Sequence, residues 1–222
     1  MPNSMYSLIL NDELVEAVDR AAYAAGTNRS SMMNRILAEY FSFTTPEQLT
    51  RDIFDHVMKL IHPDETFQIQ MQPSEAMLSI RSPLRFRYNP TIRYSVELYR
   101  NGQGAVGELR VVARTQNASL IALLEEFFRV FASVESALLG SYYQNQGPVY
   151  AIRDGRLTRR LYLTAERSSL TSEQIGEGIV EYIKTFDHCL KAYFEHSGNP
   201  EPALREIQAG CRRYLNHAPI II

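Results

Sequence analysis

Residues 5–41 read MYSLILNDELVEAVDRAAYAAGTNRSSMMNRILAEYF and contain the strongest local signals in this chain of 222 residues. Residues 5–10 are mostly apolar and have the length of a short strand. Asn11 then offers an N-cap, and the two acids that follow it suit the first turn of a helix, where the helix dipole favours negative charge. We therefore expect a strand over residues 5–10 and a helix over residues 12–25.

A second helix follows after a tight turn. Gly26 stands where a left-handed residue ends a helix, and Asn28 supplies the next N-cap. Apolar side chains then recur at helical spacing and form one broad face. These side chains are Met32, Met33, Ile36, Leu37, Tyr40 and Phe41. The pattern predicts a second amphipathic helix that ends near Phe41.

One strand and two helices of this size cannot enclose a core within a single chain. The strand also lacks a local mate for its backbone N–H and C=O groups. Pairing with the same strand of a second chain about a twofold axis would satisfy both needs. We therefore expect a homodimer, or a higher homo-oligomer, that is held together through the N-terminal residues.

The order of strand, N-cap, helix, Gly-x-Asn-Arg-Ser turn and helix resembles the ribbon-helix-helix repressors of the Arc and MetJ type. The resemblance covers residues 4–43 and implies a two-stranded intermolecular ribbon that enters the major groove of DNA. It also implies that the start of the second helix holds a phosphate. The base-contact candidates are Met5, Ser7 and Ile9, while Tyr6, Leu8 and Leu10 face the core. The phosphate-clamp candidates are Asn28, Arg29 and Ser30.

Charge leaves two functions open. Residues 1–65 hold ten acidic and five basic side chains, whereas affinity for DNA comes largely from neutralised phosphates. The first function is a dimeric DNA-binding transcriptional regulator, a repressor of the bacterial or phage type, that reads the major groove with its ribbon. The second is a protein-interaction or scaffold protein that uses the module only for dimerisation. In that case the apolar Met5 and Ile9 pack on protein.

A second domain begins after a break at residues 43–47. Thr45 is a good N-cap and Pro46 fits the first position of a helix. We therefore expect a ribbon-helix-helix module over residues 1–43 and a separate domain over residues 46–222.

The second domain alternates between helical and strand periodicity. After a helix over residues 46–61, apolar side chains recur at every second position between turn signals. The expected strands are residues 66–72, 76–87, 91–100, 106–115, 149–152 and 157–164. The expected later helices are residues 117–139, 171–194 and 200–215. This order predicts an α+β domain in which long helices pack on an antiparallel sheet, and which serves in oligomerisation, sensing or partner binding.

Positive charge gathers in the middle of the chain. Residues 66–115 hold three acidic and seven basic side chains, and all seven are arginines. Strand alternation could bring six of them to one side of the sheet, namely Arg81, Arg85, Arg87, Arg93, Arg110 and Arg114. Three roles are open for such a face. It could be a solvated surface whose arginines pair with Glu97 and Glu108. It could instead bind an anionic effector, or contact the DNA backbone. The candidates for an anion or backbone face are Arg81, Arg93, Arg110 and Arg114.

The sequence nominates no reaction. The common phosphate-loop, dinucleotide, metalloprotease and serine-hydrolase motifs do not occur in it. Cys189 and Cys211 fall in helical segments without a neighbouring Cys or His at metal-ligand spacing. We therefore expect no enzyme activity, no cofactor, no metal and two reduced thiols. Since no apolar run approaches the roughly 18 residues of a membrane span and no secretory leader is evident, we expect a cytoplasmic protein.

Overall fold

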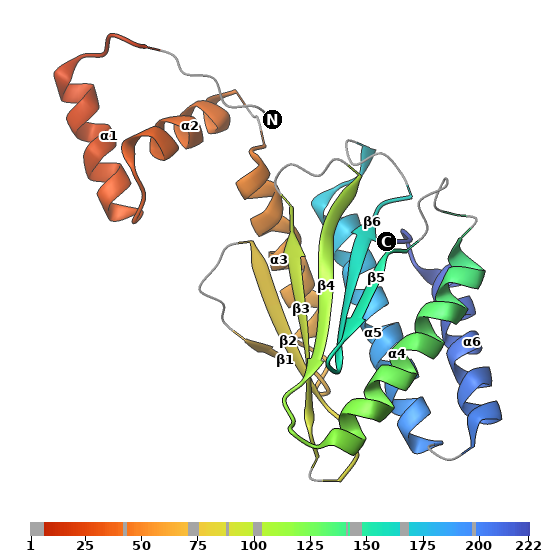
Figure 1. Ribbon diagram of the computed structural model, residues 1–222. Helices are drawn as coiled ribbons and strands as arrows, with labels where there is room; N and C mark the ends of the chain where they lie inside the picture. Colours follow the sequence, from red (N-terminus) through yellow and green to blue (C-terminus); the bar gives the residue numbers. More distant parts are fainter. Residues whose placement is uncertain are drawn as a thin grey trace. The chain divides into compact units, whose positions relative to one another are not determined.

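The computed structural model describes residues 7–41, 44–70, 76–87, 89–99, 104–140, 142, 148–164, 169–196 and 199–222. The chain divides into two compact units, Met1–Leu49 and Thr50–Ile222. The described residues form six helices and one six-stranded antiparallel sheet (Figure 1). The expected α+β class is therefore confirmed.

The first unit contains α1 (Asp12–Ala24) and α2 (Arg29–Tyr40). Side-chain caps define the start of both helices. Asn11 Oδ1 accepts a hydrogen bond of 2.8 Å from the backbone N–H of Glu13. Asn28 Oδ1 accepts one of 2.9 Å from the backbone N–H of Ser31. Gly26 lies between the helices with a φ of +62°, a left-handed conformation that glycine adopts without strain. Both predicted helices are confirmed.

The third helix, α3 (Pro46–Ile61), begins at the predicted residue. Thr45 and Gln48 cap it reciprocally: Thr45 Oγ1 accepts from the Gln48 N–H at 3.2 Å, and Gln48 Oε1 accepts from the Thr45 N–H at 3.1 Å. The division between the two units falls within this helix, after Leu49. Its later turns carry four apolar side chains of the second unit's core, Ile53, Phe54, Val57 and Ile61.

The sheet has the strand order β1-β2-β3-β4-β6-β5, and every neighbouring pair is antiparallel. Its strands are β1 (Gln68–Gln70), β2 (Met77–Pro83), β3 (Thr91–Leu98), β4 (Ala105–Ala113), β5 (Tyr150–Arg153) and β6 (Arg156–Tyr162). A tight turn with positive φ at Asp154 and Gly155 joins β5 to β6. The two strands are those expected from the sequence, and their hairpin extends the sheet by pairing β6 with β4.

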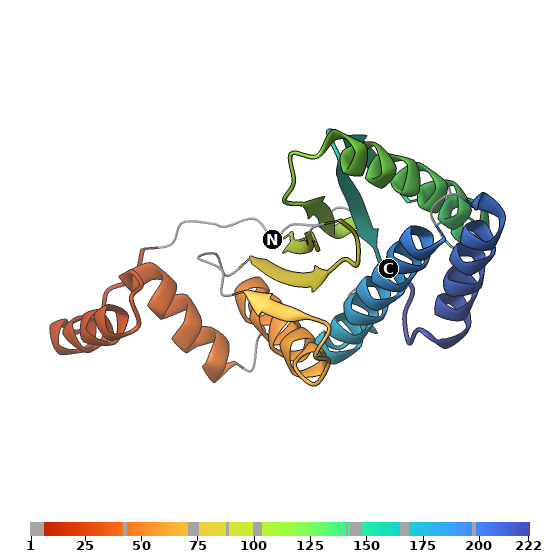
Figure 2. The same cartoon turned by 90° about the horizontal axis from the view of Figure 1, so that it is seen from below.

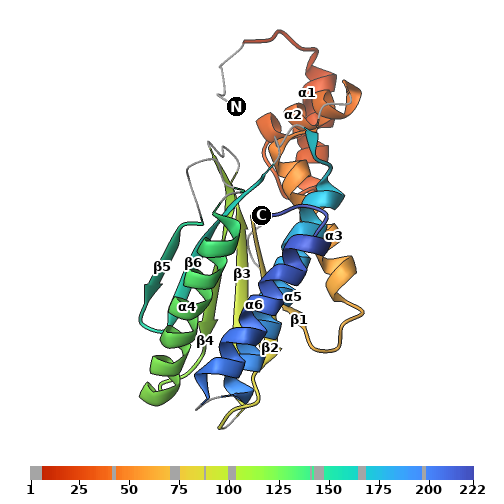
Figure 3. The same cartoon turned by 90° about the vertical axis from the view of Figure 1, so that its right-hand side faces the viewer.

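Among the described residues of the second unit, the helices lie on one face of the sheet. On β3, the alternate residues Ile92, Tyr94, Val96 and Leu98 are buried, whereas Thr91 and Arg93 are exposed. The helices α4 (Ala118–Leu139) and α5 (Ser172–Glu195) pack on the buried face, and α6 (Pro200–His217) packs against α4 and α5. Figure 2 shows the helices of this unit gathered on one side of the sheet, and Figure 3 shows α5 and α6 side by side. We call the other side of the sheet the open face.

An aromatic cluster forms the centre of this core. Phe186 of α5 packs on Phe131 of α4 with 4.6 Å between ring centroids, and on Tyr94 of β3 with 6.1 Å. The Tyr94 hydroxyl donates a hydrogen bond of 2.8 Å to Asp187, which also forms an ion pair of 2.6 Å with Lys191. The helix α5 is therefore attached to the sheet by both apolar and polar contacts.

A second polar group is fully buried between α4 and β6. Arg159 and Glu135 form an ion pair of 2.6 Å, and their side chains are 0% and 1% exposed. Glu135 also accepts hydrogen bonds from the hydroxyls of Tyr150 and Tyr182. Arg159 donates in addition to the main-chain oxygen of Ile222 at 2.7 Å. Each charge therefore has an opposite charge and further hydrogen bonds, as buried charges require.

The strand predicted over residues 76–87 is shorter than expected, because β2 ends at Pro83. Beyond it the chain turns: the Leu84 N–H donates to the Pro90 carbonyl at 2.9 Å. Arg85 and Arg87 consequently lie past the end of β2 and not on its face. Within the part of the chain that the structure describes, no helix combines the length and the apolar character needed to cross a membrane.

Candidate functional site

The first unit has a very small core within one chain. Its buried apolar cluster consists of Val18, Ala22 and Met32, and Met33 packs against it. Several other large apolar side chains of this unit are exposed to solvent. The exposed fractions are 66% for Leu8, 50% for Leu14, 41% for Ile36 and 42% for Leu37. Side chains that sequence periodicity assigns to a core are thus left uncovered in the single chain.

The segment before α1 forms neither helix nor strand over residues 7–10. A strand is defined by pairing, and the expected mate of this segment belongs to a second chain. Of the base-contact candidates, Ser7 and Ile9 are exposed, while Met5 lies outside the described residues. The paired ribbon is accordingly not part of this single-chain structure.

The start of α2 brings the phosphate-clamp candidates together. Asn28 caps the helix, and Ser30 is exposed in its first turn. Arg29 makes two hydrogen bonds to the Asp19 carboxylate, of 2.6 Å from Nε and 2.5 Å from Nη2. These bonds hold the pKa of Asp19 below its ordinary value and raise that of Arg29. The charge of Arg29 is therefore largely compensated by Asp19, and the paired N–H groups of Nε and Nη2 are occupied by that carboxylate.

The other arginines of this unit are also paired with acids. Arg20 lies 3.6 Å from Glu16, and Arg35 lies 3.9 Å from Glu39. Residues 1–49 contain three arginines, no lysine and six acidic side chains. The first unit thus offers little uncompensated positive charge for nucleic acid.

The open face of the sheet holds three of the four predicted anion-face arginines. The strand registers place Arg81 directly opposite Arg93, and Arg110 directly opposite Ser95. Arg110 is bound by both predicted glutamates: it lies 2.7 Å from Glu97 and also pairs with Glu108. The fourth arginine, Arg114, is exposed and follows the last residue of β4.

Three further arginines, which sequence reasoning did not single out, share this face. Arg156 and Arg160 lie on β6 and Arg153 lies on β5. Alternation with Leu157 and Leu161 places the first two on the polar side of their strand. Their position beside the other arginines depends on the β4–β6 pairing, which no local pattern encodes.

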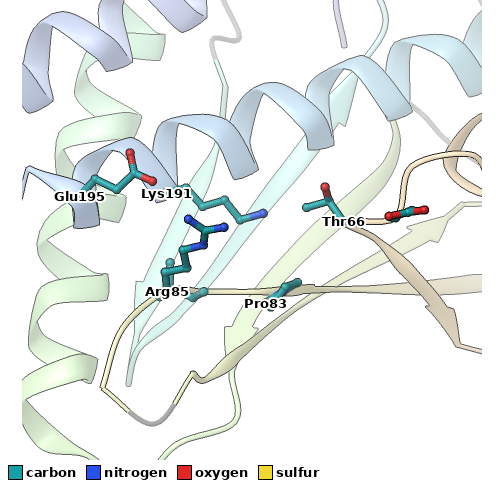
Figure 4. Close-up of a pocket in the computed structure, with 7 residues that line it drawn as sticks. Thr66, Pro83, Arg85, Lys191 and Glu195 are labelled. Atoms are coloured by element: carbon teal, nitrogen blue, oxygen red, sulfur yellow. The ribbon is translucent and has the colours of Figure 1, made fainter.

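A separate pocket lies between the end of β2 and the last turns of α5, with a volume of about 490 Å³. It is lined by Glu65, Thr66, Pro83, Leu84, Arg85, Lys191 and Glu195. In Figure 4, Arg85, Lys191 and Glu195 lie close together at one end and Thr66 lies at the other. The Lys191 ammonium is already bound to Asp187 at 2.6 Å and to Ser82 Oγ at 2.8 Å. This pocket therefore offers mixed and largely compensated charge.

Neither cysteine is placed for nucleophilic chemistry. Cys189 and Cys211 are both buried free thiols. A hydrogen bond with Cys189, together with burial, raises the pKa of the Cys211 thiol, so that it stays protonated at neutral pH. Among the described residues, no group of three or more His, Cys, Asp or Glu side chains is arranged to hold a metal ion.

Comparison with protein-family models, with curated proteins and with solved structures finds no match to this chain. Its function therefore has to be inferred from its own residues and geometry.

Proposed function

We propose that this chain is a DNA-binding transcriptional regulator that acts as a homodimer through an N-terminal ribbon-helix-helix module. The observation that carries the proposal is the uncovered apolar surface of the first unit. Leu8 faces the core in the motif, Leu14 lies in the first helix, and Ile36 and Leu37 belong to the apolar face of the second helix; all four are exposed here. A second copy would bury them, and it would supply the mate that the segment of residues 7–10 lacks.

DNA recognition follows from the same arrangement. In the dimer, the ribbon carries Met5, Ser7 and Ile9 on its outer side, where Ser7 can bond to a base and the two apolar residues can contact thymine methyl groups. The first-turn N–H groups of a helix have no partner within the helix. Asn28 satisfies that of Ser31, and those of Arg29 and Ser30 are available to a phosphate.

The oligomeric state tests the dimer. Sedimentation at micromolar concentration should show a dimer for the wild type and monomers for Leu8→Asp, because the new carboxylate would have to be buried at the interface. Tyr23→Asp is the matched control, since Tyr23 is 90% exposed and is not among the residues that the motif turns toward the core. It should remain dimeric. A monomeric wild type would overturn the proposal.

A gel-shift titration with random duplex DNA at two salt concentrations tests the function itself. The wild type should bind, and more tightly at low salt. Arg29→Ala should weaken binding to all sequences by a similar factor and reduce its salt dependence, since Arg29 acts through charge. A dimer that binds no duplex at low salt would contradict DNA binding.

That last result would favour the alternative, in which the module only dimerises an interaction protein. The pairing of Arg20, Arg29 and Arg35 with acids is the observation on its side. In this alternative Met5 and Ile9 pack on protein, so replacing both by Thr should disturb assembly. Neither the wild type nor this variant should bind duplex DNA.

A further inference from the structure

Four arginines line up in a single row across the open face. The registers pair Arg81 with Arg93, Arg93 with Val112, Val112 with Arg156, and Arg156 with Arg153. The row therefore crosses β2, β3, β4, β6 and β5. Since neighbouring strands lie about 4.8 Å apart, it extends over roughly 19 Å. We call these four side chains, Arg81, Arg93, Arg153 and Arg156, the arginine row.

The arginine row is electrostatically unfavourable in the protein alone. Arg81 lies directly opposite Arg93, and Arg153 directly opposite Arg156, and like charges at such positions destabilise a sheet. Among the described residues, none of the four forms an ion pair. A bound anion would reduce the repulsion between the two arginines of each pair and so stabilise the sheet.

The acids of the same face do not neutralise the row. Glu97 of β3 lies directly opposite Glu108 of β4 and Met77 of β2. Met77 is four residues before Arg81 on β2, so the two glutamates are four residues away from the arginine row along the strands. Four residues of a strand span about 13 Å, which exceeds the screening length of roughly 8 Å at physiological salt. Both glutamates are also occupied by Arg110. The row therefore presents positive charge to solvent.

We propose that the arginine row binds the phosphate backbone of duplex DNA. The planar guanidinium fork matches phosphate geometry. Small ligands are usually held in concave sites, whereas this row is long and lies on an open sheet face with Arg93, Arg153 and Arg156 exposed, which suits an extended polyanion. The inference rests on the proposed function and supplies the positive charge that the first unit lacks.

The test measures binding of a labelled random-sequence duplex to the full-length protein over a series of salt concentrations. Two double variants remove half of the row each, Arg81→Gln with Arg93→Gln, and Arg153→Gln with Arg156→Gln. The matched control, Arg212→Gln with Arg213→Gln, removes two exposed arginines of α6 and so makes the same change in net charge.

Each row variant should lower affinity and reduce the slope of log K against log salt by up to about 1.8, because each phosphate that is no longer neutralised lowers the slope by about 0.9. The control should keep the wild-type slope. Both row variants should unfold at the wild-type temperature or above it, because each relieves a pair of opposed like charges.

Three outcomes would overturn the inference in distinguishable ways. If the wild type binds duplex and the row variants bind like it, the row does not touch DNA, and the proposed function stands on the N-terminal module alone. If the row and control variants weaken binding equally, only net charge matters. If the wild type binds no duplex at low salt, the proposed function fails and the inference fails with it.

Discussion

Replacing Glu135 by Gln should be among the most destabilising single changes in the second unit. The substitution keeps the shape of the side chain and removes its charge. It leaves the Arg159 guanidinium, which is 0% exposed, without its 2.6 Å carboxylate partner. The carboxylate also accepts from the hydroxyls of Tyr150 and Tyr182. The new amide cannot accept at both ends, so at least one buried donor is left without its acceptor.

Breaking a buried ion pair by removing one partner costs about 3–5 kcal/mol, because the remaining charge is uncompensated. With a urea m-value of about 2 kcal/mol per molar, the unfolding midpoint should fall by roughly 1.5–2.5 M. Far-UV circular dichroism measures this directly, since α4, α5 and α6 belong to the same compact unit as the sheet and should unfold with it.

Two comparison variants make the result specific. Glu181→Gln removes one charge from an exposed position of α5 and should leave the midpoint unchanged. Glu135→Leu combined with Arg159→Met removes both charges, and it should cost less than Glu135→Gln alone because no buried charge remains unpaired. A midpoint for Glu135→Gln within about 0.3 M of the wild type would refute the reasoning.

Other parts of the molecule give further predictions. Asp19→Asn should free Arg29 and steepen the salt dependence of duplex binding by up to about 0.9 in slope, and an unchanged slope would contradict this. Since Arg29 lowers the pKa of Asp19 below 3.8, the stability that their pair contributes is present above that value. It is lost as the pH falls through the folded-state pKa, so the urea midpoints of wild type and Asp19→Asn should converge in acid. Ser7→Ala should reduce discrimination between a selected and a random duplex by at most about 1–3 kcal/mol, with little change in non-specific affinity. Gly107→Ala should lower the free energy of unfolding by about 1–3 kcal/mol in thermal or urea unfolding, because a Cβ there would lie 2.3 Å from the Glu97 carbonyl oxygen.

Helix starts were predictable because a cap is a local interaction. Asn11 and Asn28 bind N–H groups two and three residues ahead, and Thr171 forms a reciprocal capping box with Gln174. Such contacts involve neighbours in sequence and need no knowledge of the fold. Strand alternation is equally local, which is why the buried and exposed sides of β3 follow from residues 91–98 alone.

Both residues of the buried ion pair stand at core positions of the sequence pattern, but the sequence alone does not show that they pair. Glu135 lies four residues after Phe131 and four before Leu139, within the apolar stripe of α4. Arg159 lies between Leu157 and Leu161 on the inward face of β6, where every second residue is buried. A charge at a core position needs a partner of opposite sign. The two residues are 24 positions apart, and only the packing of α4 on β6 brings them together.

The open face shows the same dependence on topology. Arg81 and Arg93 were expected together because consecutive strands usually pair. Arg153 and Arg156 join them because the hairpin after α4 returns to the free edge of β4, so that residues about 60 positions from Arg93 complete its row. Arg85 leaves the face for a more local reason, since β2 ends at Pro83 and the Leu84 N–H bonds to the Pro90 carbonyl six residues ahead.

In the proposed dimer, the N-terminal unit depends on contacts that are more distant still, because they would come from a second copy of the chain. The core of the second unit closes within one chain, as Tyr94, Phe131 and Phe186 show. The first unit buries only a few side chains and exposes Leu8 at 66%. If a second copy covers that surface, folding of this unit and dimerisation are one equilibrium, and the ribbon forms only where two chains meet. Residues 7–10 of a single copy are then expected to lack strand structure, as they do here, and the exposed Leu8, Leu14, Ile36 and Leu37 of the unit are the part of the core that each protomer would contribute.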